Sequence, residues 1–202
     1  MKVPYGYLKR QYNSKRAEHI WKNYVKPVVV RGDFTLGKEV GQFEEKLCKF
    51  TGSKYSLGVA DGTNALILGL FSMGVRPGDE ILVPSLTFIA SANVIACANA
   101  SVPVFCPVND KFVLDETKIE QYITGKTVGI MAVHYQGQPC NMKKIMEIAK
   151  KHRLFVIEDT AQALGASIDG KSCGTFGDVA GISFHPQKNM NCWGDGGAVL
   201  TQ

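Results

Sequence analysis

The stretch LFVIEDTAQ, residues 154–162, runs through four apolar residues and then reaches two adjacent carboxylates, Glu158 and Asp159. An almost continuously apolar strand is typical of a parallel sheet that helices cover on both faces. Ligands of open α/β sheets bind at the carboxyl ends of the strands, so an acid there is well placed to contact one. The stretch predicts a central strand with a candidate ligand-binding acid, although one of the two carboxylates could instead be a helix cap or a surface acid.

Around this stretch, short apolar runs alternate with segments of helical periodicity from about residue 53 onward. The alternation indicates βα units and an α/β fold with a mainly parallel sheet. The predicted strands are Tyr55–Ala60, Glu80–Pro84, Val102–Phe105, Thr127–Val133, Leu154–Glu158, Val179–Phe184 and Ala198–Thr201. The predicted helices are Lys15–Tyr24, Val40–Phe50, Asn64–Met73, Thr87–Ala98, Glu116–Ile123 and Met142–His152.

The predicted elements divide the chain into two parts. We interpret residues 1–30 as an N-terminal arm or helix that packs outside the sheet, and residues 31–202 as one large domain. Only Gln202 follows the apolar run of residues 197–201. We therefore expect the large domain to be truncated at its C-terminus.

Composition narrows the class of protein. With 45% hydrophobic and 20% charged residues, the 202-residue chain resembles an ordinary globular protein, and its strand-sized apolar runs predict no membrane span and a cytoplasmic location. The net charge of +5 lacks interleaved aromatic residues, which favours solvated helix faces over nucleic-acid binding. No CxxC pair or metal-ligand spacing occurs, so no metal site is expected, and the cysteines are interpreted as small buried hydrophobes: Cys48, Cys97, Cys106, Cys140, Cys173 and Cys192.

Two segments upstream combine a strand end with a helix start. ADGTNAL, residues 60–66, would present backbone N–H groups and the Thr63 hydroxyl to an anion, which predicts a phosphate seat. The alternative is that Asp61 or Thr63 only caps the helix. In PSLTF, residues 84–88, Phe88 could lie flat on a heteroaromatic ring or belong to the core.

The last segment carries a lysine. GISFHPQKN, residues 181–189, is followed by GDGG, residues 194–197, whose glycines would permit close approach to a ligand. A lysine amine held near a cationic ring in a partly dry pocket can lose its proton and form an imine, which makes Lys188 a candidate nucleophile. His185 is a candidate proton carrier or a packed, hydrogen-bonded histidine. A carboxylate facing a pyridine nitrogen, from the pair Glu158 and Asp159, would keep that nitrogen protonated.

In this order the four segments resemble the DegT/DnrJ/EryC1/StrS family, the nucleotide-sugar aminotransferases of pyridoxal-5'-phosphate (PLP) fold type I. The resemblance implies an aspartate aminotransferase-like large domain with a mostly parallel seven-stranded sheet and helices on both faces. It also implies a smaller C-terminal domain, which we expect to be missing from this sequence. Asp61 departs from the pattern, because the family more often has a small or neutral residue there.

The resemblance also assigns roles to residues. Lys188 would carry PLP as a Schiff base and move protons, Asp159 would pair with the ring nitrogen, and Phe88 would stack on the ring. Gln162 would contact the ring on its oxygen side. The residues that would bind the phosphate are Gly62, Thr63, Asn64 and Ser183.

The implied reaction moves an amino group from glutamate to a nucleotide-linked keto-deoxysugar, in glycan or lipopolysaccharide synthesis, by a homodimer. The segments at residues 62–66 and 137–139 favour amination at sugar C3. An alternative is a truncated or regulatory relative that binds PLP or a partner subunit without turnover. Dehydration on the same scaffold is disfavoured, because the family's dehydratases replace the lysine that this chain keeps as Lys188.

Overall fold

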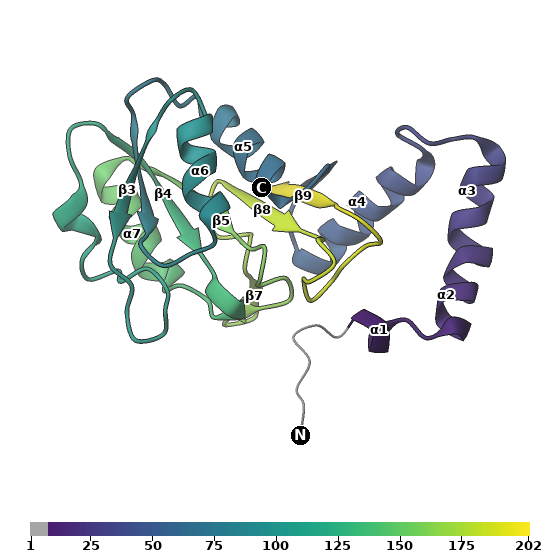
Figure 1. Cartoon of the computed structure of the whole chain (residues 1–202). Coiled ribbons are helices and arrows are strands. Elements are labelled where there is room, and N and C mark those ends of the chain that lie inside the picture. The colour runs from purple at the N-terminus through teal and green to yellow at the C-terminus, as the bar shows by residue number, and fades with distance from the viewer. Residues whose placement is uncertain (1–7) are drawn as a thin grey trace. The chain divides into compact units, whose positions relative to one another are not determined.

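The computed structural model describes residues 8–202, which divide between Glu44 and Glu45 into two compact units (Figure 1). Residues 1–7, where the predicted arm begins, lie outside the described residues. The sequence interpretation divided the chain between residues 30 and 31, and that division stays a prediction.

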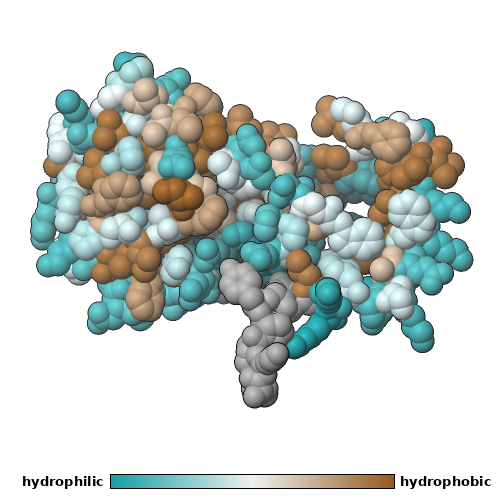
Figure 2. Space-filling view, in the orientation of Figure 1, coloured by the Kyte–Doolittle hydropathy of each residue, from teal (hydrophilic) through white to brown (hydrophobic). Residues whose placement is uncertain are grey.

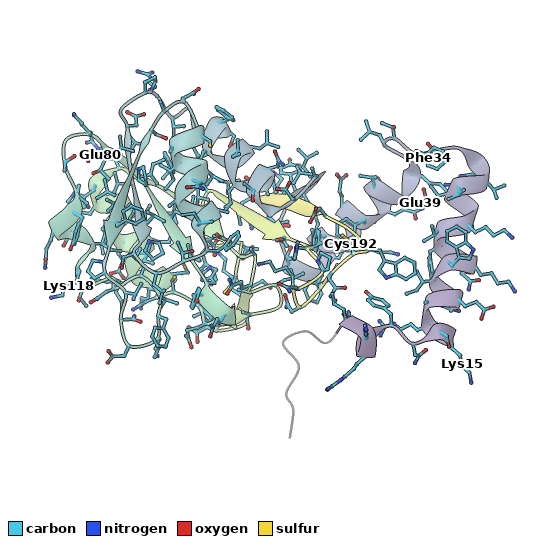
Figure 3. The ribbon with its side chains drawn as sticks, viewed as in Figure 1. Lys15, Phe34, Glu39, Glu80, Lys118 and Cys192 are labelled. Carbon is cyan, nitrogen blue, oxygen red and sulfur yellow. The ribbon has the colours of Figure 1, made fainter. Side chains whose placement is uncertain are left out.

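The first unit is helical. After the short α1 (Leu8–Gln11), three segments follow one another without a break and extend well past the predicted Lys15–Tyr24: α2 (Ser14–Ile20), the π-helical η1 (Trp21–Val25) and α3 (Lys26–Arg31). Gly32 ends α3 with φ +69°. The next helix, α4 (Lys38–Thr51), runs across the division, and its Glu39, labelled in Figure 3, pairs with Arg31 at 2.8 Å.

The second unit is built on a seven-stranded sheet in the order β1-β9-β8-β5-β4-β2-β3. The strands are β1 (Tyr55–Val59), β2 (Glu80–Pro84), β3 (Val102–Cys106), β4 (Thr127–Val133), β5 (Phe155–Asp159), β8 (Val179–Ser183) and β9 (Gly197–Thr201). Strand β9 is antiparallel to both of its neighbours, β1 and β8, and the other neighbouring pairs are parallel. The predicted mostly parallel seven-stranded sheet is therefore confirmed, with every strand boundary within one residue of its prediction.

Helices cover both faces of this sheet. On one face α5 (Gly62–Ser72) and α6 (Ile89–Cys97) pack against Ile81, Met131 and Ile157. On the other face α7 (Met142–His152) packs against residues that alternate with these: Leu82, Ile130 and Val156. Such alternation places successive side chains of each strand in two separate cores.

One predicted helix is wrong. Residues 116–123 contain only the 3₁₀ turn η2 (Ile119–Tyr122), because Asp115 Oδ1 accepts hydrogen bonds from both the N–H and the hydroxyl of Thr117. Such local side-chain bonds compete with helix formation. A second short turn, η3 (Tyr135–Gly137), follows β4.

A small hairpin was not predicted. Strands β6 (Ser167–Ile168) and β7 (Lys171–Ser172) are joined by Asp169 and Gly170, both with positive φ. An Asp-Gly pair of this kind is a hairpin signal that the sequence did carry.

The sheet gathers several chain segments at one edge. The parallel strands end there, and β9 begins there, because Gly197 pairs with both Ser183 and Val59.

The surface of this unit mixes apolar and polar side chains on the face visible in Figure 2. Cys97 is exposed, so the interpretation of that cysteine as a buried residue is wrong. Within residues 8–202 no helix is long and apolar enough to cross a membrane, and no group of three or more His, Cys, Asp or Glu could hold a metal ion.

Candidate functional site

Asp159 ends β5 and is almost buried, with 6% of its surface exposed. Each carboxylate oxygen accepts one hydrogen bond: Oδ2 from the Ser91 hydroxyl at 2.7 Å, and Oδ1 from the Ala161 N–H at 3.1 Å. These two donors fix the orientation of the carboxylate at the carboxyl edge of the sheet. Acceptor capacity remains for a further donor, because an ionised carboxylate can accept about four hydrogen bonds.

The neighbouring Glu158 points to the opposite face, because side chains alternate along a strand. It is fully buried and accepts hydrogen bonds from His134 Nε2 at 2.9 Å and from the N–H groups of Gly174, Phe176 and Gly177 at 2.7–2.8 Å. Burial raises the pKa of Glu158, but the hydrogen bonds from His134, Gly177 and Gly174 outweigh burial and hold the pKa below its usual value. Glu158 is thus neither a helix cap nor a surface acid.

His134 is a residue that the sequence interpretation missed. It follows β4 directly and is fully buried. Its Nδ1 accepts a hydrogen bond from the Cys140 N–H at 3.0 Å, so the ring proton lies on Nε2, where it faces Glu158. Its backbone N–H donates to the Asp159 carbonyl oxygen at 3.1 Å. The only sequence signal was a histidine at the end of an apolar strand, and a partner 24 residues away leaves no pattern.

The predicted phosphate-binding segments come together where α5 begins. A Cβ atom on Gly62 would lie 2.6 Å from the Cβ of Ser183, so the first turn of α5 contacts the end of β8 directly. Gly197 packs against the backbone of Asp61 and Gly62, where any Cβ would overlap those atoms. The close approach that the last glycine of GDGG permits is therefore to the start of α5.

Asp61 caps α5, as the capping alternative predicted. Its carboxylate accepts hydrogen bonds from the backbone N–H and the side-chain Nδ2 of Asn64, both at 2.8 Å. Asn64 therefore directs two donors toward Asp61. Thr63 is exposed in the first turn, where the N–H groups of Gly62 and Thr63 have no acceptor within the helix.

Lys188 lies in the loop of residues 184–196 that joins β8 to β9, and this loop starts and ends at the carboxyl edge. The Lys188 N–H donates to the His185 carbonyl at 2.8 Å, and Asn189 Nδ2 donates to the Leu164 carbonyl at 2.6 Å. The second bond ties the loop to the segment that follows Asp159. Cys192, labelled in Figure 3, donates from Sγ to the Phe184 carbonyl at 3.2 Å, and burial raises the pKa of its thiol.

Three further candidates differ in their surroundings. Phe88 directly precedes α6 and is 63% exposed, so the core alternative for it is wrong. Gln162 accepts the Gln136 N–H on Oε1 at 2.6 Å, which leaves its amide NH₂ as the end that can donate to a ligand. His185 is exposed, contrary to the packed alternative, and its Nδ1 accepts the Gln187 N–H at 3.2 Å.

The sequence and the fold match known proteins. The sequence model of the DegT/DnrJ/EryC1/StrS aminotransferase family matches residues 16–202, and the chain belongs to that family. It is 38% identical over 200 residues to the dTDP-3-amino-3,4,6-trideoxy-alpha-D-glucose transaminase of Streptomyces venezuelae, covering 99% of this chain and 52% of that protein. It is 45% identical over 193 residues to the dTDP-3-amino-3,6-dideoxy-alpha-D-galactopyranose transaminase of Aneurinibacillus thermoaerophilus, covering 95% and 53%.

A third relative carries a different name. The pleiotropic regulatory protein of Geobacillus stearothermophilus is 38% identical over 202 residues, which is 100% of this chain and 54% of that protein. The chain thus spans about half the length of these relatives.

Solved structures agree with the fold. A DegT/DnrJ/EryC1/StrS aminotransferase from Brucella abortus superposes with a TM-score of 0.93 at 35% identity, covering 99% of this chain and 55% of that one. NtdA from Bacillus subtilis, solved with bound cofactor PMP, gives a TM-score of 0.91 at 34% identity, covering 99% and 45%. The family is PLP-dependent, and its members include sugar aminotransferases.

Proposed function

We propose that the chain is the cofactor-binding half of a PLP-dependent aminotransferase that transfers an amino group from glutamate to a nucleotide-linked keto-deoxysugar, in glycan or lipopolysaccharide synthesis. One observation carries the proposal. Asp159, the Gly62–Ser183 contact and the loop of Lys188 come from separate segments and gather at one edge of the sheet. Sheets of this kind bind their ligands at that edge.

The residues present fit PLP. An almost buried carboxylate with remaining acceptor capacity, Asp159, suits a protonated ring nitrogen, and the exposed Phe88 suits the ring face. The first turn of α5 with Gly62, Thr63 and Ser183 suits a phosphate. When bound, the cofactor supplies an electron sink for the substrate Cα.

The remaining roles are those that the family resemblance implies. The Lys188 amine would hold the cofactor covalently and would take up and return the proton of the amino-donor Cα. Gln162 donates from its NH₂ to the ring oxygen, since its Oε1 is taken by Gln136. His185, exposed in the Lys188 loop, is the candidate second proton carrier. Asn64 supports the phosphate seat through its bonds to Asp61.

The substrate and assembly are part of the proposal. Two of the similar proteins are named for sugars with a 3-amino group, which supports amination at sugar C3. We infer a homodimer as the working assembly, from the family alone.

A second candidate is a regulatory or catalytically incomplete relative that binds PLP or a partner subunit without turnover. It is favoured by the likeness to the pleiotropic regulatory protein over the full length of this chain. The two candidates differ in one measurement. Glutamate converts the bound cofactor to its amino form if the chain is a working transaminase half, and leaves it unchanged if the chain only binds.

Cofactor attachment is tested by mixing the chain with PLP, reducing with borohydride and mapping the modified peptide. We expect the label on Lys188 and its loss in Lys188→Ala. Lys126 offers a matched control, because it is an exposed lysine that directly precedes β4, at the amino end of the strands. Lys126→Ala should retain full labelling. Label on another residue, or undiminished label in Lys188→Ala, would contradict the assignment.

A further inference from the structure

Two hydroxyl groups connect α6 to Asp159. Ser91, in the first turn of α6, is fully buried, and its Oγ lies 2.7 Å from Asp159 Oδ2. Thr87, partly buried and just before the helix, has its Oγ1 2.8 Å from Ser91 Oγ. The three side chains form one line of hydrogen bonds that joins segments 68 residues apart.

The direction of these bonds follows from proton counting. A serine hydroxyl has a single proton, and an ionised carboxylate can only accept. Ser91 therefore donates its proton to Asp159, and the Thr87 hydroxyl must donate to Ser91 Oγ. Hydrogen bonds aligned in this way polarise and strengthen one another in a buried setting.

The same short segment also presents the candidate stacking residue. Phe88 lies between Thr87 and Ser91, and its carbonyl accepts the Ser91 N–H at 3.0 Å. The groups proposed to contact the ring face and the ring nitrogen are thereby held by one helix start. A shift of this turn would move both together.

We propose that Ser91 and, through it, Thr87 are positioning residues that hold the Asp159 carboxylate toward the cofactor's ring nitrogen. The inference rests on the proposed function. Within residues 8–202, the other hydrogen bond to this carboxylate comes from the Ala161 N–H, which donates to Oδ1. Without the Ser91 hydroxyl, Oδ2 loses the bond that sets the plane of the carboxylate.

The test compares Ser91→Ala with the wild-type chain by PLP titration, by the pH dependence of the bound cofactor's absorbance, and by crystal structures without cofactor. We expect PLP affinity to fall about tenfold or more, as for loss of a hydrogen bond to a charged group. We also expect an altered absorbance profile and a rotated Asp159 carboxylate. Ser101→Ala is the matched control, because Ser101 is a buried serine whose hydroxyl donates to the carbonyls of Ile95 and Ala98.

A second pair of variants changes Thr87, which is only partly buried. Thr87→Val removes the outer hydroxyl and should weaken PLP binding by a few-fold, whereas Thr87→Ser keeps the hydroxyl and should restore it. Unchanged affinity and absorbance in Ser91→Ala, or equal losses in Ser101→Ala, would overturn the inference. If the wild-type chain fails to bind PLP while Ser91→Ala still rotates Asp159 in the crystal, the proposed function fails and the positioning of the carboxylate stands.

Discussion

Glu158 and Asp159 are consecutive carboxylates of one strand, yet they lie in two different regions of the molecule. Glu158 is fully buried between the end of β4 and residues 174–177, where His134 and three backbone N–H groups donate to it. Asp159 faces the carboxyl edge, with two donors and a small exposed surface. A buried charge is tolerated only where donors compensate it, and Glu158 has the fuller set.

The different hydrogen-bond partners of the two carboxylates predict a structural role for one and a ligand-binding role for the other. A carboxylate whose acceptor capacity is used by the protein holds the segments that donate to it, here the end of β4 and residues 174–177. A carboxylate with capacity left over can accept a proton donor from a ligand. We therefore expect Glu158 to hold the fold and Asp159 to contact the ligand.

The largest expected effect is on stability in Glu158→Leu. This change leaves the Nε2–H of His134 and the N–H groups of Gly174, Phe176 and Gly177 buried without an acceptor. Breaking a buried charged network costs about 3–5 kcal/mol, so the urea midpoint should fall sharply. Glu147→Leu is the control, since its exposed bond to Lys144 at 3.2 Å contributes little. Equal midpoints for the two variants would contradict the anchoring role of Glu158.

A smaller effect is expected on the stability of the fold at low pH. The pKa of Glu158 lies below its ordinary value of 4.5 in the folded chain, so its ionised form stabilises the fold above about pH 4.5. That stabilisation is lost as the pH falls through the folded pKa. Thermal melts at decreasing pH should therefore show a shallower decline for Glu158→Gln than for the wild-type chain.

An exposed acid provides the contrast for these melts. The hydrogen bonds of Lys151 and His152 to Glu120 lower the pKa of that carboxyl to about 2, and its side chain is exposed to solvent. Salt screens exposed ion pairs more than buried ones. Added salt should therefore reduce the contribution of Glu120 to stability, which is measured as the difference between the wild-type chain and Glu120→Gln. The contribution of Glu158 to stability should stay nearly unchanged. A Glu158 contribution that salt abolishes would show that its region is not closed.

The sequence predicted the sheet well because each strand is a short, nearly continuous apolar run. It did not predict the 3₁₀ turn at residues 119–122, because the competing bonds of Asp115 to Thr117 are local and override helical periodicity. The strand pattern alone could not separate Glu158 from Asp159, and only the family resemblance gave Asp159 a role. Alternation along the strand shows that the two differ, but which side holds His134 depends on the neighbouring strand.

Within the candidate site, ordered motifs predicted roles for Asp159, Ser183 and Lys188, whereas the contacts that support these residues could not be predicted. Ser91 lies 68 residues from the acid it binds, and no spacing rule joins a mid-segment serine to a distant strand end. Asp61 shows the reverse case. It caps α5 by accepting the N–H of Asn64, three residues along the chain, and the sequence did offer this local pattern as an alternative.

The smallest expected change in stability is in Asp159→Asn. An asparagine keeps one carbonyl oxygen, which can accept the Ala161 N–H, and its NH₂ takes the place of Oδ2, where the Ser91 hydroxyl can turn to accept a hydrogen bond from it. The free energy of unfolding, measured with urea, should therefore change by less than about 1 kcal/mol, the ordinary net value of one hydrogen bond. The same variant should lose most of its glutamate-dependent conversion of bound PLP, because an amide cannot hold the ring nitrogen protonated. Glu158→Gln should show the reverse ranking, with the larger loss in the midpoint. If Asp159→Asn instead unfolds as readily as Glu158→Leu, both acids are structural, and the carboxyl edge of β5 does not hold the cofactor's ring nitrogen.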